Sequence, residues 1–499
     1  MQGVYPLFTA VPLAAAFFNL LVTKINKKVA DLIAFIVTAY LAVFSIMMLG
    51  SEPFIYKVGG WLPPWGILLV FDRLSAIMLI IINVIAFLVI IFSIKYMTTY
   101  TAKPKYFSLF LLMVAGMNGV VITGDFFNLY VFLEIASIAS YALVGFGCER
   151  EELEASFKYL ILGGVASTAI LFGIAFLYSV TGTLNMPHLA QRLELLGMNK
   201  AVFFAIALFI MGFGLKASTV PFHAWLPDAH PSAPAPISAM LSGVLIKALG
   251  VYTLIRVMFF IIGQSPLIAS VFLFLGALSM VVAGLLAIGQ DDFKRMLAYS
   301  SISQIGYVMV GLGLALNPNV PVAVQTLGLL GAIYHLVNHA VFKSLLFLGS
   351  GAVEYRTGTR DLNKLGGLIA RMPVTGATCS IGALSIAGLP PFNGFWSKLI
   401  IILALLQGGY IVYGTLAIAV SFITLFYFVK LQSKAFFGTL PEKLKGIKEA
   451  PFAMTLPLVI LAALCIALGV AYPLFSDRLV QAAGTILDRA SFIGFLWGG

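Results

Sequence analysis

The sequence predicts an all-α polytopic membrane protein, and two observations lead to this fold class. Of the 499 residues, 61% are hydrophobic and only 10% are charged, whereas a soluble domain carries roughly 25% charged residues. Apolar runs long enough to cross a bilayer, which takes about 20 residues each, follow one another along the chain. These proportions exclude a soluble globular enzyme, a disordered chain and a nucleic-acid-binding module, although the net charge is +11.

Fourteen apolar runs, bounded by charge, Pro or Gly, are the expected membrane helices. Their spans are 4–23, 29–50, 75–98, 106–123, 126–147, 156–180, 201–221, 234–262, 267–289, 297–317, 321–351, 372–408, 410–434 and 451–475. The first run has no basic residue before it and no small-residue cleavage site, so we expect a retained helix rather than a signal peptide. The longest loops, 51–74 and 181–200, contain Gly and Pro, and we expect them to cap the helix bundle and not to form a separate domain. We therefore expect one membrane domain over 1–499.

The basic residues predict how this bundle is oriented. Loops and helix ends after odd-numbered runs hold eighteen lysines and arginines, and those after even-numbered runs hold five, Arg256 among them. Because cytoplasmic loops are enriched in Lys and Arg, we expect a multi-pass protein of the cell membrane with both termini outside. The segment QDDFKRMLAYSS, with Asp291, Asp292, Lys294 and Arg295, then reads as a solvated cytoplasmic turn.

The cysteines and the motif content predict no bound metal or cofactor in this chain. Cys148, Cys379 and Cys465 lie far apart in the sequence and form neither a metal-like cluster nor a disulfide framework. We expect three membrane-buried thiols. The sequence also lacks flavin, iron–sulfur and nucleotide motifs.

Six charged residues fall inside or at the edge of apolar runs, although a charge at the bilayer centre costs about 2.5–3.5 kcal/mol. They are Glu134, Lys158, Lys216, Lys247, Lys343 and Lys398. Such residues mark ion paths or proton relays, and a Glu–Lys pair that separates and rejoins has two protonation states within reach at neutral pH. Structural roles stay open. Lys158 could extend to the cytoplasmic face, Lys343 and Lys398 could anchor helix ends, and the others could form structural ion pairs.

Two runs are interrupted in a similar way. Lys216 precedes five prolines in and after the seventh run, and Pro390 and Pro391 precede Lys398 in the twelfth. Proline breaks helical hydrogen bonding, and broken helices at matching positions in two halves indicate an inverted-repeat transporter core. Packing kinks are the alternative. The expected parts are 1–105 with three helices, 106–262 as the first repeat, 267–434 as the second repeat and 451–475 as the last helix.

The eleventh run carries a polar stripe. His335, His339 and Lys343 are spaced by four and share one helix face. Two histidines at this spacing can bind zinc, but no third ligand lies nearby, so a hydrated proton path is favoured. A structural hydrogen-bonding stripe is the alternative. Four residues are possible auxiliary members, Lys158, His223, Asp228 and His230, and the last three could form an exit or a helix-joining loop.

Several motifs together resemble a known family. They are GDFFNLYVFLEIASIASYALV, FKYLILGG, FGLKASTVPFHAWLPDAHPSAPAPISAMLSGVLIKALGVY, DDFKRMLAYSSISQIGY, HLVNHAVFKSLLFLGSGAV and GLPPFNGFWSKL. Over roughly residues 70–435 the chain is similar to the antiporter-like subunits of respiratory complex I, of Mrp-type cation/proton antiporters and of membrane-bound hydrogenases. RDLNKLGGLIARMP and NHAVFKSLLFLGSG resemble the hydrogenase and Mrp D-type members most.

The resemblance implies a fourteen-helix fold with two inverted five-helix repeats and a proton path along the membrane plane. It also implies roles for buried charges by position. The matching positions, from the fifth helix to the twelfth, are Glu134, Lys216, Lys247, His335, His339, Lys343 and Lys398. The last of these is Glu in some members of the family.

We therefore expect a proton-translocating subunit of a multisubunit redox-driven complex, either a membrane-bound hydrogenase or a complex I-like NADH/quinone oxidoreductase. Its partners would be other membrane subunits and peripheral redox subunits, and the driving reaction would lie outside this chain. One alternative is a D-type subunit of a multisubunit Na+/H+ antiporter, which has no redox partner. The other is a structural scaffold that has lost conduction, and the presence of every buried charge argues against it.

Overall fold

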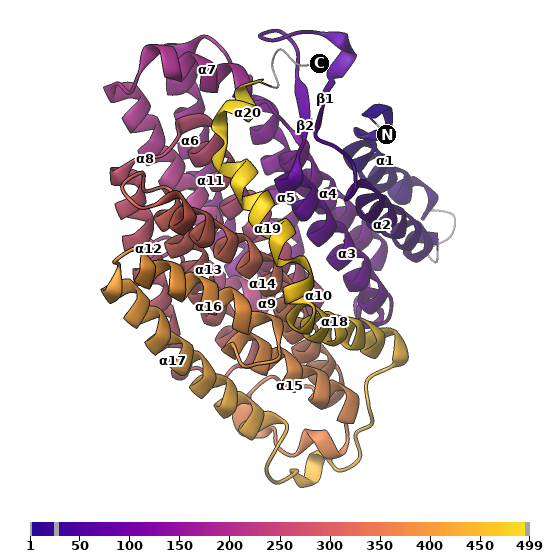
Figure 1. The fold of residues 1–499 in the computed structure, drawn as a ribbon. Helices are drawn as coiled ribbons and strands as arrows, with labels where there is room; N and C mark the ends of the chain where they lie inside the picture. The colour runs from indigo at the N-terminus through magenta and orange to yellow at the C-terminus, as the bar shows by residue number, and fades with distance from the viewer. Residues whose placement is uncertain (1, 24–28, 495–499) are drawn as a thin grey trace.

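Apolar helices build almost the whole chain in the computed structural model, which describes residues 2–23 and 29–494 (Figure 1). Within these residues, eleven helical segments are long and apolar enough to cross a membrane, and α1, α15 and α16 are shorter apolar helices. The prediction of a polytopic helical protein is thereby confirmed. The helices are α1 (Leu7–Val22), α2 (Val29–Met48), α3 (Arg73–Tyr96), α4 (Lys103–Ile122), α5 (Phe126–Val144), α6 (Arg150–Thr181), α7 (Met186–Leu196), α8 (Lys200–Lys216), α9 (Leu226–Ser232), α10 (Ala235–Met240), α11 (Thr253–Ile255), α12 (Pro266–Ile288), α13 (Phe293–Ala315), α14 (Val322–Thr357), α15 (Pro373–Ala387), α16 (Asn393–Gln407), α17 (Ile411–Ala435), α18 (Phe452–Val470), α19 (Tyr472–Leu487) and α20 (Arg489–Gly494).

The two long loops contain structure that the sequence did not predict. Strands β1 (Phe54–Lys57) and β2 (Leu68–Phe71) form an antiparallel hairpin in which Phe54 lies opposite Phe71. The all-α prediction is wrong here, because these aromatic and β-branched residues pack as a pleated pair against Tyr5. The other loop contains α7, whose first turn is capped by the side chain of Asn185.

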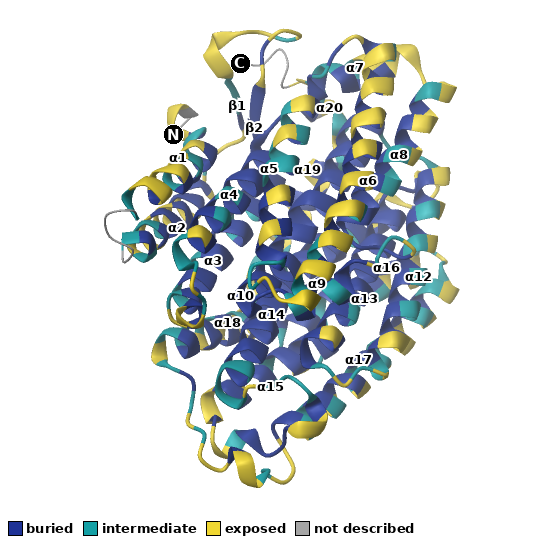
Figure 2. Cartoon of the chain, turned by 180° about the vertical axis from the view of Figure 1, so that it is seen from behind, coloured by how far each residue is buried: buried dark blue, intermediate teal, exposed yellow. Residues whose placement is uncertain are grey.

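The most deeply buried helices lie at the centre of the bundle (Figure 2). Every residue in the most apolar stretch of segment 235–262 is buried, and α13 and α14 are nearly as enclosed. Helix α14 packs against α13, α15, α16, α18, α10 and α19. Outer helices such as α6 and α17 instead expose apolar side chains. The helices that carry most of the buried charge are therefore the innermost ones.

Segment 235–262 departs from regular α-helix around Lys247. Leu241–Leu245, Lys247–Tyr252 and Arg256–Ile262 are π-helical, and such turns often occur at functional sites. Gly250 lets this segment touch the end of α8, because a Cβ there would lie 2.5 Å from Cα of Ala217. The glycine therefore brings the elements that carry Lys216 and Lys247 into direct backbone contact.

Both predicted helix interruptions are present. Helix α8 ends at Lys216, and a series of turns separates it from α9. Helix α15 ends at Ala387, and α16 begins at Asn393, so that Lys398 lies in the second turn of α16. Gly388 follows the last residue of α15 and has a φ of +85°, in the left-handed region that favours glycine.

The two ends of the bundle differ in character. At one end, the loops 289–292, 358–372 and 436–451 pack together, with Phe293 N–H donating to Arg360 O at 3.0 Å (bottom of Figure 1). We call this the charged end. The hairpin, α7 and α20 lie at the other end. Helix α19 runs obliquely across the bundle and contacts α14, and Arg489 in α20 donates to Ile261 O at 2.6 Å.

Candidate functional site

Lys216 is held by hydroxyl groups of α5. It is 3% exposed at the C-terminus of α8, and its Nζ donates to Ser137 Oγ at 2.9 Å and to Tyr141 OH at 3.1 Å. Glu134 lies one turn before Ser137 on the same face of α5, half-buried, and accepts a hydrogen bond from Ser167 Oγ. The described residues show no ion pair between Glu134 and Lys216, so the predicted pair is separated in this structure, and Lys216 binds Ser137, one turn after Glu134 on α5.

Lys247 is fully buried in the π-helical part of segment 235–262. Its Nζ donates to Ser242 O, five residues earlier, at 2.5 Å. The acceptor belongs to the backbone of the same segment. The irregular helix thus positions both the amine and the carbonyl that binds it.

Lys343 and His339 lie in the middle of α14, fully buried. Lys343 Nζ donates to Leu297 O at 2.7 Å and to Ser300 Oγ. The helix continues to Thr357, so Lys343 is not an anchor at a helix end. The two ring nitrogens of His339 have no hydrogen-bond partner among the described residues.

His335 links α14 to two neighbouring helices. Its Nδ1 lies 2.9 Å from Ser397 Oγ in α16, and its Nε2 lies 3.1 Å from Gln304 Oε1 in α13. The His335 and His339 rings are nearly parallel, with centroids 6.2 Å apart. The predicted polar stripe on α14 therefore exists; His335 at one end contacts α16 of the broken helix, and Lys343 at the other end contacts α13.

Lys398 lies beside the break between α15 and α16 and binds a backbone carbonyl there. The side chain is 3% exposed, and its Nζ donates to Ala387 O, at the end of α15, at 3.4 Å. The same Nζ lies 4.9 Å from the centroid of the Tyr307 ring. The interruption thus supplies a free carbonyl to a buried amine, and Lys398 is not an anchor at the bilayer surface.

These groups lie on neighbouring elements at the centre of the molecule. Segment 235–262 touches the end of α8 at Gly250, the His335 and His339 rings of α14 are 6.2 Å apart, and His335 contacts α16, which carries Lys398. In the part of the chain that the structure describes, Lys216, Lys247, Lys343 and Lys398 have no ion pair. We call Lys216, Lys247, His339, Lys343, His335 and Lys398 the central row.

Buried polar atoms without a protein partner accompany the central row. Within residues 2–23 and 29–494 they include both ring nitrogens of His230 and His339, Gln304 Nε2, Asn338 Oδ1, Ser385 Oγ and both amide atoms of Asn393. Such atoms in native proteins bind internal water or take part in function. Their concentration here favours a hydrated path over a purely structural hydrogen-bonding stripe.

The auxiliary candidates divide between the surface and the core. Lys158 is 47% exposed at the charged end and pairs with Glu154 at 2.8 Å and with Asp228 at 3.0 Å. Lys158 therefore lies outside the central row. It has the surface position that the sequence analysis gave as the alternative to a buried role. His223 is half-buried beside the break. His230 is fully buried in α9 and stacks on Phe347 with centroids 4.6 Å apart.

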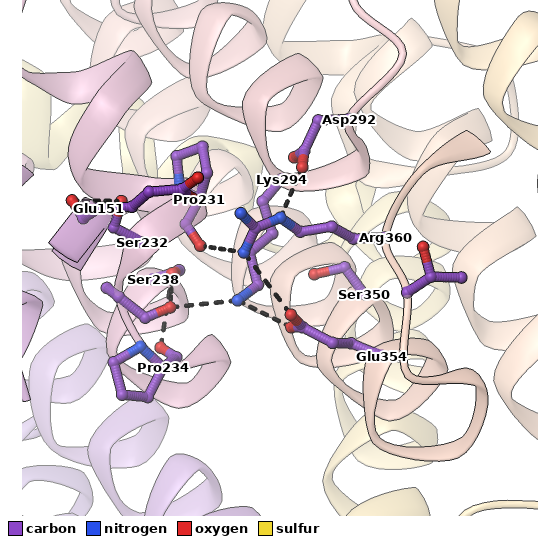
Figure 3. A network of polar contacts seen from close by, with 12 residues as sticks. Glu151, Pro231, Ser232, Pro234, Ser238, Asp292, Lys294, Ser350, Glu354 and Arg360 are labelled. Carbon is purple, nitrogen blue, oxygen red and sulfur yellow. Dashed lines mark hydrogen bonds and ion pairs between the residues drawn. The ribbon is translucent and has the colours of Figure 1, made fainter. Parts of the chain in front are cut away.

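A buried charge cluster at the charged end was missed in the sequence. The expectation of a solvated turn is wrong for Lys294, which is 2% exposed because α9 covers the first turn of α13, and which pairs with Glu354 at 2.9 Å. Arg360 joins this pair to Asp292, with 2.5 Å between Nε and Oδ2 (Figure 3). The sequence offered one signal for this pair. Glu354 lies one turn before the end of α14, and Lys294 lies in the first turn of α13.

A second missed pair lies toward the other end. Arg256, expected in a loop or at a helix end, is 3% exposed, and its Nη2 donates to Asp72 Oδ1 at 2.7 Å. Burial raises the pKa of the Asp72 carboxyl, but the Arg256 guanidinium and the hydrogen bonds from Ser75 together outweigh it, so the pKa lies below its ordinary value. The pair joins the N-terminus of α3 to segment 235–262.

The cysteines differ from the prediction at one position. Cys379 and Cys465 are buried as expected, but Cys148 is exposed, because it lies in the turn between α5 and α6 at the charged end. In the described ranges no three His, Cys, Asp or Glu side chains come close enough to hold a metal ion.

Comparisons with known proteins agree with this arrangement. Residues 123–424 match the family model described as NADH:quinone oxidoreductase/Mrp antiporter, TM. Residues 59–107 match the model for the N-terminus of chain 5 of NADH-ubiquinone oxidoreductase (complex I).

Relatives from three kinds of complex are similar over most of the chain. The N-type subunit of the NADH-quinone oxidoreductase of Desulforudis audaxviator is 33% identical, covering 95% of this chain and 96% of the relative. The D-type subunit of the Na(+)/H(+) antiporter of Alkalihalophilus pseudofirmus is 36% identical, covering 88% and 87%. A chain of the membrane-bound sulfane sulfur reductase, an archaeal respiratory membrane complex, superposes with a TM-score of 0.89 at 34% identity, covering 99% and 100%. The chain therefore belongs to the family of NADH:quinone oxidoreductase and Mrp antiporter membrane subunits.

Proposed function

We propose that this chain is the proton-translocating subunit of a multisubunit redox-driven complex, a membrane-bound hydrogenase or a complex I-like NADH/quinone oxidoreductase. The central row carries the proposal, because it gathers buried amines and imidazoles on neighbouring helices, and its lysines have no ion pair among the described residues. A buried lysine in such a site can lose and regain its proton. The driving reaction would take place in other subunits.

The geometry supports a switch at one end of the row and a relay along the rest. When Glu134 approaches Lys216, it stabilises the charged amine, and when it returns to Ser167 the amine keeps only Ser137 and Tyr141. A proton released from Lys216 would pass to Lys247 and then through the α14 stripe to Lys398. Internal water at the unpartnered polar atoms would bridge the gaps.

We also infer fourteen membrane helices with inverted repeats over 106–262 and 267–434. The two interruptions support this inference, since each places a lysine beside a broken helix end. The excess of Lys and Arg in the loops after odd-numbered helices supports placing both termini outside the cell membrane.

The first prediction tests the relay. Lys216→Ala and Glu134→Ala should each lower the proton transport rate by about a hundredfold, because each removes a group that handles the proton. The complex should still assemble. Proton movement into membrane vesicles that carry the complete complex, followed with a pH-sensitive dye, measures the rate.

Lys200→Ala is the matched control, since Lys200 is the exposed lysine at the other end of α8. It should transport at the wild-type rate. Wild-type rates in both Lys216→Ala and Glu134→Ala would refute the relay.

The second candidate function is a D-type subunit of a multisubunit Na+/H+ antiporter. The 36% identity to a D-type antiporter subunit favours it. Purification with the partner subunits separates the two functions. Redox subunits in the complex, and proton transport that requires an electron donor, would support the redox-driven complex. A complex without them, in which a Na+ gradient alone drives proton movement, would establish the antiporter.

A further inference from the structure

Two adjoining cavities form a groove between α17 and the broken helix α15–α16. The first, of about 310 Å³, is lined by residues 387–390 of the break, by α16 and by α17. The second, of about 390 Å³, continues along α15 and α17. Leu425 lines both cavities, so they meet at this residue. We call the two cavities together the lateral groove (α15, α16 and α17 in Figure 1).

The lateral groove is mainly apolar and opens on the outside of the bundle. Phe422 and Val429, which line its two halves, are 68% and 54% exposed. Along α17 its lining runs from Ile418 to Ser433, which is about 22 Å of helix. One leaflet of the hydrocarbon core is about 15 Å thick. The groove is therefore long enough to hold a lipid acyl chain.

A single charged side chain lines this apolar groove. Lys398 lines the first cavity, and among the described residues no other Asp, Glu, Lys or Arg lines either half. Gly388 leaves room for it, because a Cβ at position 388 would lie 2.9 Å from Lys398 Cδ. Tyr307 connects the two polar side chains of the first cavity. Its ring centroid lies 4.9 Å from Lys398 Nζ, and its hydroxyl lies 2.8 Å from Ser421 Oγ.

The amine of Lys398 has more donors than this chain has acceptors for it. An ammonium carries three N–H donors, and the described residues offer one acceptor, Ala387 O at 3.4 Å. No carboxylate pairs with Lys398 in this part of the chain. A buried ammonium without a counter-charge attracts an anion strongly, because its surroundings are poorly polarisable. The amine can therefore bind an anionic acceptor that enters through the groove.

We propose that the lateral groove binds a long-chain fatty acid, whose carboxyl group pairs with Lys398 and whose acyl chain lies along α17. A fatty acid matches both features of the groove, because it joins one carboxyl group to one unbranched apolar chain. A phospholipid matches less well. Its headgroup stays in the polar surface layer of the bilayer, whereas the helix break lies near the middle of the expected membrane span 372–408.

The acid can reach the amine without carrying a charge. A protonated fatty acid is neutral, and its O–H proton passes to the neutral Nζ of Lys398. The O–H bond breaks and an N–H bond forms, so the products are a carboxylate and an ammonium, each of which stabilises the other. Lys398 then keeps its proton, and the proposed relay stops there. Binding of the acid does not depend on the proposed proton transport, whereas the block rests on it.

The binding test uses the purified complete complex in detergent. The probe is palmitic acid with a photoreactive diazirine in its chain, and the labelled peptides should map to α15, α16 and α17. The methyl ester of the same probe is the matched ligand control, since it keeps the chain but has no acidic proton. The ester should label at least about tenfold less, because it forms no ion pair. Equal labelling by acid and ester would overturn the pairing with Lys398.

Two substitutions locate the site. Lys398→Met keeps an unbranched side chain but removes the amine, so the acid should label this variant no better than the ester does. Leu425→Trp fills the junction of the two cavities and should abolish labelling; Val429→Trp, in the second cavity, replaces it if that complex does not assemble. Leu171→Trp, at an exposed position of α6, is the control. Undiminished labelling in the groove variants, or labelling confined to another subunit, would overturn the site.

The block is measured as proton transport in vesicles that carry the complete complex. With palmitic acid at about ten times its Kd, about nine-tenths of the sites are occupied, and the wild-type rate should fall about tenfold. Free fatty acids also carry protons through lipid, so Leu425→Trp vesicles, which leak equally, are the reference and should keep their rate. Equal inhibition of wild type and Leu425→Trp would overturn the block.

The outcomes distinguish this proposal from the proposed proton transport. Wild-type transport in both Lys216→Ala and Glu134→Ala would refute the relay, while labelling of the groove by the acid would still establish the binding site. Loss of transport in those two variants, together with no labelling of α15, α16 or α17 in the wild type, would refute the fatty-acid site alone.

Discussion

At the level of single residues, the amines of the central row are bound by acceptors that carry no charge. Lys216 uses a serine and a tyrosine hydroxyl, whereas Lys247 and Lys398 use backbone carbonyls. A hydroxyl or carbonyl oxygen accepts a hydrogen bond from an ammonium and from a neutral amine alike. A carboxylate would favour the charged form strongly. The partners therefore fix the position of each amine without fixing its protonation state.

Tyr141→Phe tests this role of the neutral partners. It removes one of the two acceptors of Lys216 but keeps the ring, and we expect a loss of about 1 kcal/mol of folding stability together with a reduced transport rate. Tyr178→Phe, at an exposed position of α6, is the control. Equal transport rates in the two variants, measured in vesicles that hold the intact complex, would contradict the assignment.

Residues of the candidate site were predictable where a charge falls in an apolar run. Lys216, Lys247, Lys343 and Lys398 stand out in the sequence because burying them is costly, and all four are buried. Their hydroxyl partners were not predictable, since Ser137 and Tyr141 are ordinary residues of an apolar helix. Lys294 was misplaced because a DDFKR segment is typical of an exposed turn, and only the tertiary cover of α9 buries it.

At the level of elements, the sequence predicts interruptions better than it predicts short structures. Clustered prolines interrupt the apolar runs after Lys216 and Ala387 as predicted, whereas the single prolines Pro12 and Pro457 lie inside the continuous helices α1 and α18. The four-residue strands β1 and β2 carry too little pattern to be distinguished from a loop. The π-helical turns around Lys247 depend on packing against α8 and α14, which local sequence does not encode.

Gly250→Ala tests the contact between segment 235–262 and α8. The new Cβ would lie 2.5 Å from Cα of Ala217, so the backbones must separate, and we expect a loss of about 1–3 kcal/mol of stability together with slower transport. Thermal inactivation of the purified complex measures the first effect.

Gly164→Ala is the matched change, because a Cβ at Gly164 in α6 meets nothing within 4 Å. It should leave stability and transport equal to or better than wild type, since alanine favours the helix. If Gly250→Ala behaves like Gly164→Ala, the close approach does not matter.

At the level of the whole molecule, the surface agrees with an embedded subunit that has neighbours. Outer helices expose apolar side chains such as Phe172 in α6 and Phe422 in α17. The chain of the membrane-bound sulfane sulfur reductase that superposes on this one is itself part of a larger membrane complex. The charged residues gather at the ends and in the core.

Cys148 offers a direct test of orientation with a native residue. It is exposed at the charged end, which we propose to be cytoplasmic because of the distribution of Lys and Arg. An impermeant maleimide should therefore label Cys148 in inside-out vesicles and leave it unlabelled in intact cells. Cys148→Ser identifies the labelled position, and the opposite pattern of labelling would reverse the proposed orientation.

The absence of ion pairs along Lys247, Lys343 and Lys398 in the described structure has a consequence for how the row holds charge. Like charges repel strongly where the surroundings are poorly polarisable. With no negative neighbour to offset them, two adjacent amines cannot both stay protonated at low cost. In the proposed relay, charge would therefore advance in single file: a site would fill only as the next one empties, and a blocked exit would halt uptake at the entrance.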